Sequence, residues 1–341
     1  MEDAIARYLE ARIPGARDMK VTHLLRIPGG ASRETWMFKA TWHTDAGRHA
    51  EELILRKDPP ASLLETDRET EYAFYSTFPG SRVPVPRMRW LEPDPSHLGG
   101  PFFVMDRVLD IEASPVVILE PQYESVRPRI ARELYEILAA IHAFDWRDSP
   151  AHRASPLPPP APGECWQREV AHWERIINEN EISPQPIIRA AIRWLRRNPP
   201  PPAERVTIVH GDYRVGNVLY ATDGSIRGVV DWEMAHLGDP IEDIAWSFMA
   251  DWERAHDGKK GGIVVAADAI RIYEEASGVK VDPAALRWWS VFSNVKAQAI
   301  WLTGARSFQE GRSTELIHAM VAWALINPED ENALRSLGRM E

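Results

Sequence analysis

The apolar residues of this chain follow two different periods, one in its first third and another in the remainder. Four short runs rich in β-branched and aromatic residues lie before Asp110, at 35–42, 52–56, 87–91 and 101–108. One stretch of helical period, 66–78, interrupts them. From Asp110 onward apolar residues recur at helical spacing, as in 127–144. The chain is therefore predicted to be an α+β protein, with a small sheet and one helix followed by a larger, mainly helical part.

Turn and breaker residues divide these segments further. A turn signal at 45–47 separates the first two runs, so those strands should pair antiparallel. Ahead of them, 5–13 has the spacing of a short amphipathic helix. The proline-dense stretch 149–163 is predicted to be a loop or extended connector, because proline removes helix donors. We expect two domains, 1–107 and 108–341.

Two further short β runs, 218–220 and 226–230, are joined by a turn signal at 222–225. In an antiparallel hairpin the residue before the first strand lies beside the residue after the second, which brings Asn217 next to Asp231. A carboxylate and an amide carbonyl suit Mg²⁺, which prefers oxygen ligands and completes its shell with water and phosphates. The hairpin therefore predicts a magnesium site.

Asp212 lies five residues before Asn217, on the loop between a buried strand and the hairpin. A carboxylate there can orient a hydroxyl and accept its proton as the oxygen attacks phosphorus. His210 and Gly211 are expected to shape this loop, since glycine permits close approach and histidine can hydrogen-bond across a turn. For His210 a structural role and a direct role in proton transfer both stay open.

These motifs carry a resemblance to a known family. His-Gly-Asp at 210–212 with Asn217, followed by Val-Val-Asp-Trp-Glu at 229–233, resembles the aminoglycoside phosphotransferase and choline kinase superfamily. The resemblance extends from about residue 22 to about 310. Within the superfamily the sequence is most similar to the branch found fused to acyl-CoA dehydrogenases. It implies a two-lobed, protein-kinase-like fold, with a small antiparallel sheet in the N-lobe and a catalytic hairpin in a helical C-lobe.

The resemblance also implies a reaction and a set of site residues. Asp212 would be the catalytic base, with His210 beside it, and Asn217 and Asp231 would hold Mg²⁺. The γ-phosphate of ATP, as co-substrate, would move to a hydroxyl of a small molecule; GTP stays open as the donor. Asp243 would buttress the catalytic loop.

The amino-terminal half contains two segments that resemble those with which the same family contacts the nucleotide. Gly29, Gly30 and Ser32 lie in a segment similar to the hairpin turn that covers the nucleotide, where backbone N–H groups can meet phosphates. An ordinary β turn would explain this segment equally well. The run 101–108 is similar to the segment that joins the lobes, so backbone groups from Asp106 to Val108 would meet the adenine edge.

The strand 53–57 resembles the one that carries the phosphate-contacting lysine of kinases, but Arg56 occupies the inward place. Because side chains alternate along a strand, Arg56 and the adjacent Lys57 cannot both face the cleft, and we favour Arg56. By resemblance Glu69 would be its partner from the following helix. Glu71 is the rival for that role.

Composition narrows the class of function. A net charge of -10 argues against a nucleic-acid partner, because phosphate backbones are bound mainly by clustered Lys and Arg. The single cysteine, Cys165, suits a reducing compartment, and the acidic start and the lack of a long apolar run favour a cytoplasmic protein without a membrane partner.

One alternative comes from another class of protein. An inactive kinase-like module that binds nucleotide or acts as a scaffold stays open, because Arg56 replaces lysine. The presence of Asp212, Asn217 and Asp231 together favours the enzyme. The acceptor, the oligomeric state and any part in antibiotic resistance stay undetermined, because fold does not fix substrate.

Overall fold

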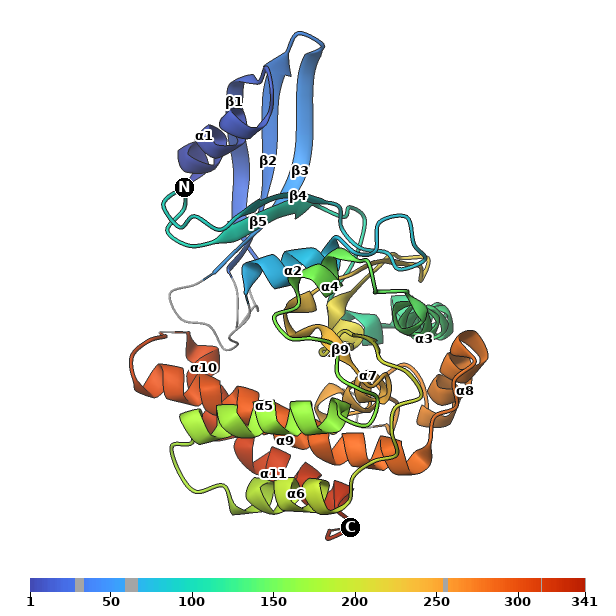
Figure 1. Cartoon of the computed structure of the whole chain (residues 1–341). Helices are drawn as coiled ribbons and strands as arrows, with labels where there is room; N and C mark the ends of the chain where they lie inside the picture. Colours follow the sequence, from blue (N-terminus) through green and yellow to red (C-terminus); the bar gives the residue numbers. More distant parts are fainter. Residues whose placement is uncertain (28–33, 59–66, 254–256, 314, 341) are drawn as a thin grey trace.

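A five-stranded antiparallel sheet forms the upper lobe in Figure 1, with strand order β1-β2-β3-β5-β4. The computed structural model describes residues 1–27, 34–58, 67–253, 257–313 and 315–340. The strands of this sheet are β1 (Arg17–Arg26), β2 (Glu34–Thr44), β3 (Gly47–Lys57), β4 (Met88–Glu92) and β5 (Phe102–Asp106). The predicted antiparallel pairing of the first two runs is confirmed, since Thr44 lies opposite Gly47 at the end of the β2–β3 ladder.

One strand, β1, was not predicted from the sequence. Of its ten residues only Val21 is buried, so it lacks the alternation of a half-buried strand. Its pairing with β2 is also irregular, and Asp18 and His23 both have positive φ. Its pattern therefore carries little of the signal by which strands are found in a sequence.

The two faces of the sheet pack against different helices. Leu53 and Leu55 of β3 join a small core with the helix α1 (Glu2–Arg12). Ile54 instead joins the main core, which includes Phe74 of α2 (Arg68–Tyr75). The alternation expected for β3 is therefore present, and it directs Arg56, two residues after Ile54, toward the lower lobe.

The lower lobe is mainly helical, as the sequence predicts (Figure 1). Its helices are α3 (Arg127–Ala143), α4 (Pro150–Ala154), α5 (Cys165–Asn180), α6 (Pro186–Arg197), α7 (Ile241–Ser247), α8 (Ala266–Ser277), α9 (Pro283–Gln309), α10 (Leu316–Ala324) and α11 (Ile326–Ser336). Among the described residues no helix combines the length and the apolar character that crossing a membrane requires.

The helix α9 is the centre of this lobe. Asp282 accepts hydrogen bonds from the backbone N–H groups of Ala284 and Ala285, and Pro283 occupies the first position, which together fix its start. The helix is buried on nearly every side and contacts α5, α6, α7, α10 and α11. A polar side chain in the middle of α9, at 291–300, therefore lies in the interior.

Part of the proline-dense segment is helical, so the prediction of a loop or connector over 149–163 is wrong for its first residues. Ser149 accepts a hydrogen bond from the N–H of His152, and Pro150 stands at the first helical position of α4. Proline is tolerated there because the first N–H of a helix has no partner within the helix. The rest of the segment is not helical apart from the start of a turn before α5.

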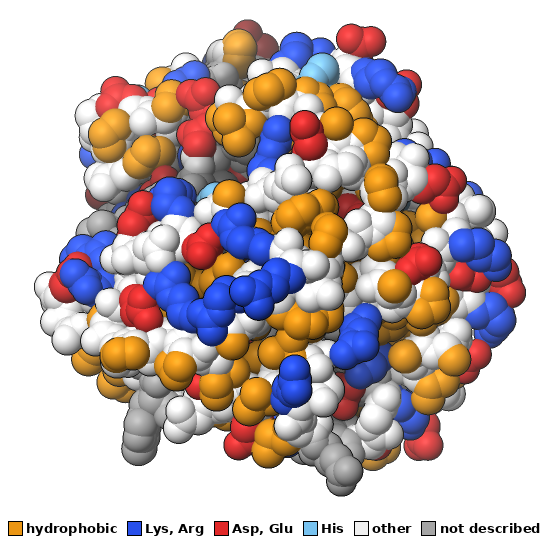
Figure 2. Space-filling model, turned by 60° about the horizontal axis from the view of Figure 1, so that its bottom comes forward, with side chains coloured by type: hydrophobic (Ala, Val, Ile, Leu, Met, Phe, Trp, Pro, Cys, Tyr) orange, Lys and Arg blue, Asp and Glu red, His pale blue; other side chains and the backbone are white. Residues whose placement is uncertain are grey.

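At the end of the lobe where α6 and α11 lie, α6 has one apolar and one basic face. Ile188, Ile192 and Leu195 are buried, whereas Arg196 and Arg197 are exposed. Figure 2, which turns this end forward, shows Lys and Arg side chains gathered on the surface among scattered carboxylates. Arg196 pairs with a glutamate of the neighbouring α5, so part of this positive charge is compensated.

Two small antiparallel ladders lie under the upper lobe. One pairs β6 (Thr207–Val209) with β9 (His236–Gly238), and the other pairs β7 (Val218–Tyr220) with β8 (Ile226–Val229). The second is the predicted hairpin. Residues 210–217 connect β6 to β7, so the loop that holds Asp212 is fixed at both ends by a strand.

Candidate active site

The loop after β6 is held by one buried carboxylate. Asp243 of α7 accepts hydrogen bonds from the backbone N–H groups of His210 (2.7 Å) and Gly211 (2.8 Å). Gly211 has φ +81°, and a Cβ there would lie 2.3 Å from the carbonyl oxygen of Met234, so only glycine fits. The expected buttressing role of Asp243 is confirmed.

Three donors fix the carboxylate of Asp212. Its Oδ1 accepts from the indole N–H of Trp246 at 2.6 Å and from Nε of Arg214 at 3.0 Å. Its Oδ2 accepts from the amide of Asn217 at 2.6 Å. The side chain keeps 16% of its surface exposed, so it is held in one orientation and still reaches the solvent side of the loop.

His210 is buried and both of its ring nitrogens are engaged. Nδ1 accepts from the backbone N–H of Asp212 at 3.2 Å, which leaves the proton on Nε2 to donate to the carbonyl of Val230 at 3.1 Å. Burial lowers the pKa of His210, which favours this neutral form. The ring thus ties the loop of Asp212 to the end of β8, an arrangement that suits a structural role.

The hairpin brings Asn217 and Asp231 together, as its turn signal predicts. The backbone N–H of Val230 donates to the carbonyl of Asn217 at 2.9 Å. Asp231 follows in a left-handed conformation (φ 71°, ψ 57°), and its N–H donates to the hydroxyl of Tyr75 at 2.8 Å. Because the Asn217 amide nitrogen donates to Asp212, its side-chain carbonyl oxygen is left as an acceptor.

Carboxylates from both lobes converge on Arg56. Its guanidinium lies 2.8 Å from Asp231, 3.3 Å from Glu71 and 4.0 Å from Glu233. Glu71 also pairs with the buried Arg68. Burial alone would raise the pKa of the Asp231 carboxyl, but the Arg56 guanidinium holds it below its usual value.

The predicted pairing of Glu69 with Arg56 is wrong, and Glu71 makes this contact. Glu71 is fully buried, whereas Glu69 is exposed. The two residues lie about 200° apart around the helix, so only one can face the sheet. Glu71 shares its face with Phe74 and Tyr75 of the core, and this phase of α2 decides between them.

The other residues that the sequence analysis discussed as possible nucleotide contacts lie in three different places. Lys57 points away from Arg56 and pairs with Glu34 of β2 at 3.1 Å. At the junction of the lobes, the N–H groups of Asp106 and Arg107 donate to neighbouring strands, whereas that of Val108 makes no hydrogen bond within the described residues. The predicted phosphate-covering residues Gly29, Gly30 and Ser32 lie outside the residues that the structure describes.

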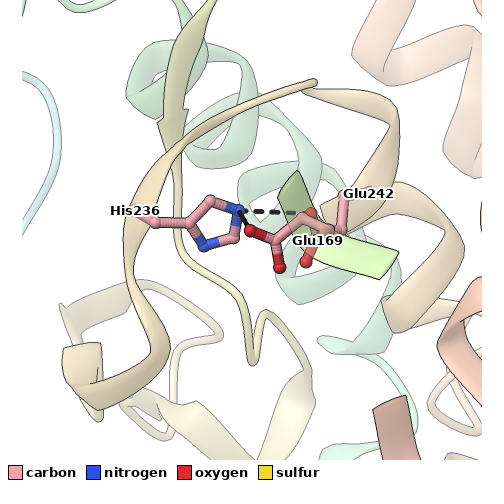
Figure 3. A group of neighbouring side chains, drawn as sticks. All are labelled: Glu169, His236 and Glu242. Atoms are coloured by element: carbon pink, nitrogen blue, oxygen red, sulfur yellow. Dashed lines mark hydrogen bonds and ion pairs between the residues drawn. The ribbon is translucent and has the colours of Figure 1, made fainter. Parts of the chain in front are cut away.

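A second polar cluster lies behind the loop (Figure 3). Nε2 of His236 lies 3.2 Å from a carboxylate oxygen of Glu242 and 3.5 Å from one of Glu169. Burial alone would lower the pKa of His236, but these two carboxylates raise it to about 9. Lys296 of α9 pairs with the other oxygen of Glu242 at 2.9 Å.

This cluster has the residue types of a metal centre, but its charges already compensate one another. Two carboxylates face one imidazolium and one ammonium, and Nδ1 of His236 donates to the carbonyl of Met234. A protonated Nε2 has no lone pair for a metal. The arrangement therefore suits a buried ion-pair network better than a cation site.

Several contacts of Asp212 were missed by reasoning from the sequence. Trp246 lies one helical turn after Asp243, so the two share a face of α7. Since Asp243 was expected to contact the loop of Asp212, this spacing indicates that Trp246 lies near the same loop. Arg214 stacks on Trp252, with its guanidinium carbon 4.6 Å from the ring centroid. Lys296 carried a weaker signal, a single cation within the apolar stretch of α9.

The chain has a kinase-like fold, which it shares with several solved structures. A Ralstonia eutropha protein classed as an aminoglycoside phosphotransferase is 20% identical, with a TM-score of 0.73 over 99% of this chain and 98% of that one. A thermostable mutant of aminoglycoside phosphotransferase APH(4)-Ia, in complex with ADP and hygromycin B, is 16% identical, with a TM-score of 0.60 over 98% of both chains. Macrolide 2′-phosphotransferase type I is 19% identical, with a TM-score of 0.57 over 95% of both.

The chain belongs to the phosphotransferase enzyme family, whose model matches residues 23–289. Among curated proteins, mouse acyl-CoA dehydrogenase family member 10 is 27% identical over 96% of this chain and 31% of its own length. Human acyl-CoA dehydrogenase family member 11 is 27% identical over 81% of this chain and 35% of its own. The chain thus spans about a third of the length of these relatives.

Proposed function

We propose that this protein transfers the γ-phosphoryl group of Mg-ATP to a hydroxyl of a small molecule. Asp212 serves as the base, and Asn217 and Asp231 hold the metal. The single observation that carries the proposal is the convergence of Asp212, Asn217 and Asp231 at the end of one hairpin, with Arg56 of the other lobe 2.8 Å from Asp231.

The residues present fit a magnesium ion. Asn217 offers its amide oxygen and Asp231 a carboxylate, both of the oxygen type that Mg²⁺ prefers. Among the described residues, three carboxylates surround Arg56, and a second guanidinium, that of Arg68, pairs with one of them, so carboxylates still outnumber guanidinium groups and the local charge favours a further cation. When bound, the ion would neutralise charge on the phosphates.

Asp212 supplies the remaining chemistry. Its carboxylate is oriented by Trp246, Arg214 and Asn217 and would accept a hydrogen bond from the acceptor hydroxyl. As the acceptor oxygen bonds to the γ-phosphorus, the bond between that phosphorus and the β–γ bridging oxygen breaks, and ADP leaves with that oxygen. The hydroxyl proton passes to the Asp212 carboxylate.

The nucleotide would lie between Arg56 and the junction of the lobes. Arg56 is the inward cation of β3, because Lys57 is paired with Glu34 on the other side. The N–H of Val108, which no described residue accepts, would be free to meet the adenine edge. The neighbour APH(4)-Ia was solved with ADP and with AMP-PNP, which supports ATP as the donor.

The acceptor is tested by pools of hydroxyl compounds of different chemistry. Solved neighbours suggest aminoglycosides and macrolides, and the names of the curated relatives suggest hydroxyacyl thioesters of coenzyme A. Incubation with γ-labelled ATP, Mg²⁺ and each pool should place label on one small molecule, and Asp212→Asn should remove that label. Tight Mg-ATP binding without transfer to any pool would favour the inactive, nucleotide-binding alternative.

A further inference from the structure

The loop of Asp212 rests on a buried lysine that none of the catalytic motifs includes. Lys296 lies in the middle of α9 and is only 1% exposed. Its Nζ donates to the carbonyl of Gly211 at 2.7 Å and to Glu242 at 2.9 Å. Gly211 directly precedes Asp212, so α9 is joined to the catalytic loop by this one side chain.

Lys296 also braces a residue that touches the Asp212 carboxylate. Its ammonium lies 4.9 Å from the ring centroid of Trp246 and 5.5 Å from that of Trp173, distances typical of cation–π contacts. Trp246 in turn donates its indole N–H to Asp212. The lysine therefore reaches the base by two routes, through the Gly211 backbone and through Trp246.

A buried ammonium is costly unless it is paired and hydrogen-bonded, and an apolar side chain of similar length would fill the same space. Lys296 would need Glu242 alone to compensate its charge. The bond to Gly211 is an additional contact, directed at the one loop that holds the base. Asp243 accepts from the N–H groups of His210 and Gly211, and Lys296 donates to the carbonyl of Gly211.

We propose that Lys296 is a positioning residue of the phosphotransfer site, holding the Gly211 carbonyl and bracing Trp246 so that the Asp212 carboxylate is kept in one orientation. The inference rests on the proposed function of Asp212. Glu242, shared between Lys296 and His236, anchors the lysine in turn.

The first test compares Lys296→Met with the double variant Lys296→Met/Glu242→Gln. Hydrogen exchange of the His210, Gly211 and Asp212 amides reports on the loop whether or not an acceptor is known. A hydrogen bond from a charged group is worth enough to slow local opening by about tenfold or more, so Lys296→Met should speed exchange by that factor. Its turnover should fall by about 10²-fold at an unchanged Kd for Mg-ATP.

The double variant separates positioning from charge compensation. If Lys296 only neutralises Glu242, removing both charges restores slow exchange and wild-type turnover, which would overturn the proposal. If it positions the loop, the Tm recovers while exchange stays fast and turnover stays low. Failure of wild-type protein to bind or use Mg-ATP would sink the proposed function, yet the exchange result would still decide the role of Lys296 in holding the loop.

A second pair of variants tests the route through tryptophan. Trp246→Phe keeps an aromatic ring over Lys296 but loses the donor to Asp212. Trp288→Phe loses an equally buried indole hydrogen bond, to the carbonyl of Leu195, away from the loop. Turnover should fall about tenfold in Trp246→Phe and stay at the wild-type value in Trp288→Phe. Equal turnover in the two variants would contradict the proposal.

Discussion

Two clusters of charged side chains lie near the loop of Asp212, an upper wall around Arg56 and a lower network around Glu242, and their charges are balanced differently. On the upper side, carboxylates from both lobes converge on Arg56, and Glu71 is shared with a second arginine, Arg68. On the lower side, the carboxylates of Glu169 and Glu242 are matched by His236 and Lys296. The upper wall carries more negative than positive charge, whereas the network behind the catalytic loop is neutral.

This difference suits the two clusters to different tasks. A cluster in which carboxylates outnumber cations gains by taking up a further cation, so under the proposed function the wall at Asp231 would hold the metal that arrives with a nucleotide. A neutral, fully paired network has nothing to gain from an ion and instead fixes the backbone that it contacts. If Asp212 is the base, as proposed, one cluster would bind the metal and the other would position the base.

The largest effect is expected from removing the carboxylate of Asp212, the proposed base, which the neutral network is proposed to position. Asp212→Asn should keep Mg-ATP binding, because the upper wall is intact, and lose turnover by about 10²-fold or more. Parallel measurement of nucleotide Kd and phosphate transfer checks this expectation. Asp145→Asn, on an exposed ion pair with Arg147, is the matched control. Wild-type transfer by Asp212→Asn would remove that carboxylate from the mechanism.

Stability should distinguish the two glutamates of α2. Glu71→Gln leaves Arg56 and Arg68 buried without the carboxylate they share, which should lower the free energy of unfolding by about 3 kcal/mol. Glu69→Gln changes an exposed side chain and should leave the urea midpoint in place. Equal midpoints for the two variants would show that the upper wall does not depend on its carboxylates.

The metal dependence of nucleotide binding tests the upper wall directly. Asp231→Ala should weaken ATP binding in the presence of Mg²⁺ by about tenfold to 100-fold, since a ligand is lost. In the presence of a chelator the variant should bind ATP at least as well as the wild type, because a negative charge near the phosphates is gone. Calorimetric titrations with and without Mg²⁺ measure both quantities, and two identical pairs of curves would contradict the assignment.

The smallest effect expected is a pH dependence of stability from the lower network. The pKa of His236 is raised in the folded protein to about 9 from an ordinary value near 6.5. The folded state therefore binds more protons between these values, so its stability is full below about pH 6.5 and falls as pH rises through about 9. We expect the free energy of unfolding to fall by about 1 kcal/mol between pH 7 and pH 8, since each pH unit within the shifted range corresponds to about 1.4 kcal/mol. His236→Gln should remove this slope, and an unchanged slope would assign it to another group.

Much of this fold follows from patterns that short segments carry by themselves. The β2–β3 ladder, the β7–β8 hairpin and the helix α3 were predicted because turn residues and apolar periodicity are local signals. The strand β1 was missed because its exposed residues give no alternation. The helix α4 was missed because proline density was read as a connector, although proline suits the first helical position.

The site divides in the same way. Asn217 and Asp231 could be brought together from the hairpin alone, since one turn fixes their register. The sequence could not decide whether Glu69 or Glu71 pairs with Arg56, because the side of a short helix that faces the core depends on what the helix packs against. The contact of Trp246 with Asp212 could have been inferred only from the helical spacing between Trp246 and Asp243. Lys296 reaches the loop of Asp212 from a distant segment, and no local pattern encodes that contact.

The most direct test of this account locates a bound metal. Crystals grown with Mn²⁺ and a non-hydrolysable ATP analogue allow the ion to be identified by its anomalous scattering. The account predicts a manganese ion between Asn217 and Asp231, with no ion at Glu169, His236 and Glu242. A manganese ion within that second cluster, or none near Asp231 while the nucleotide is bound, would contradict it.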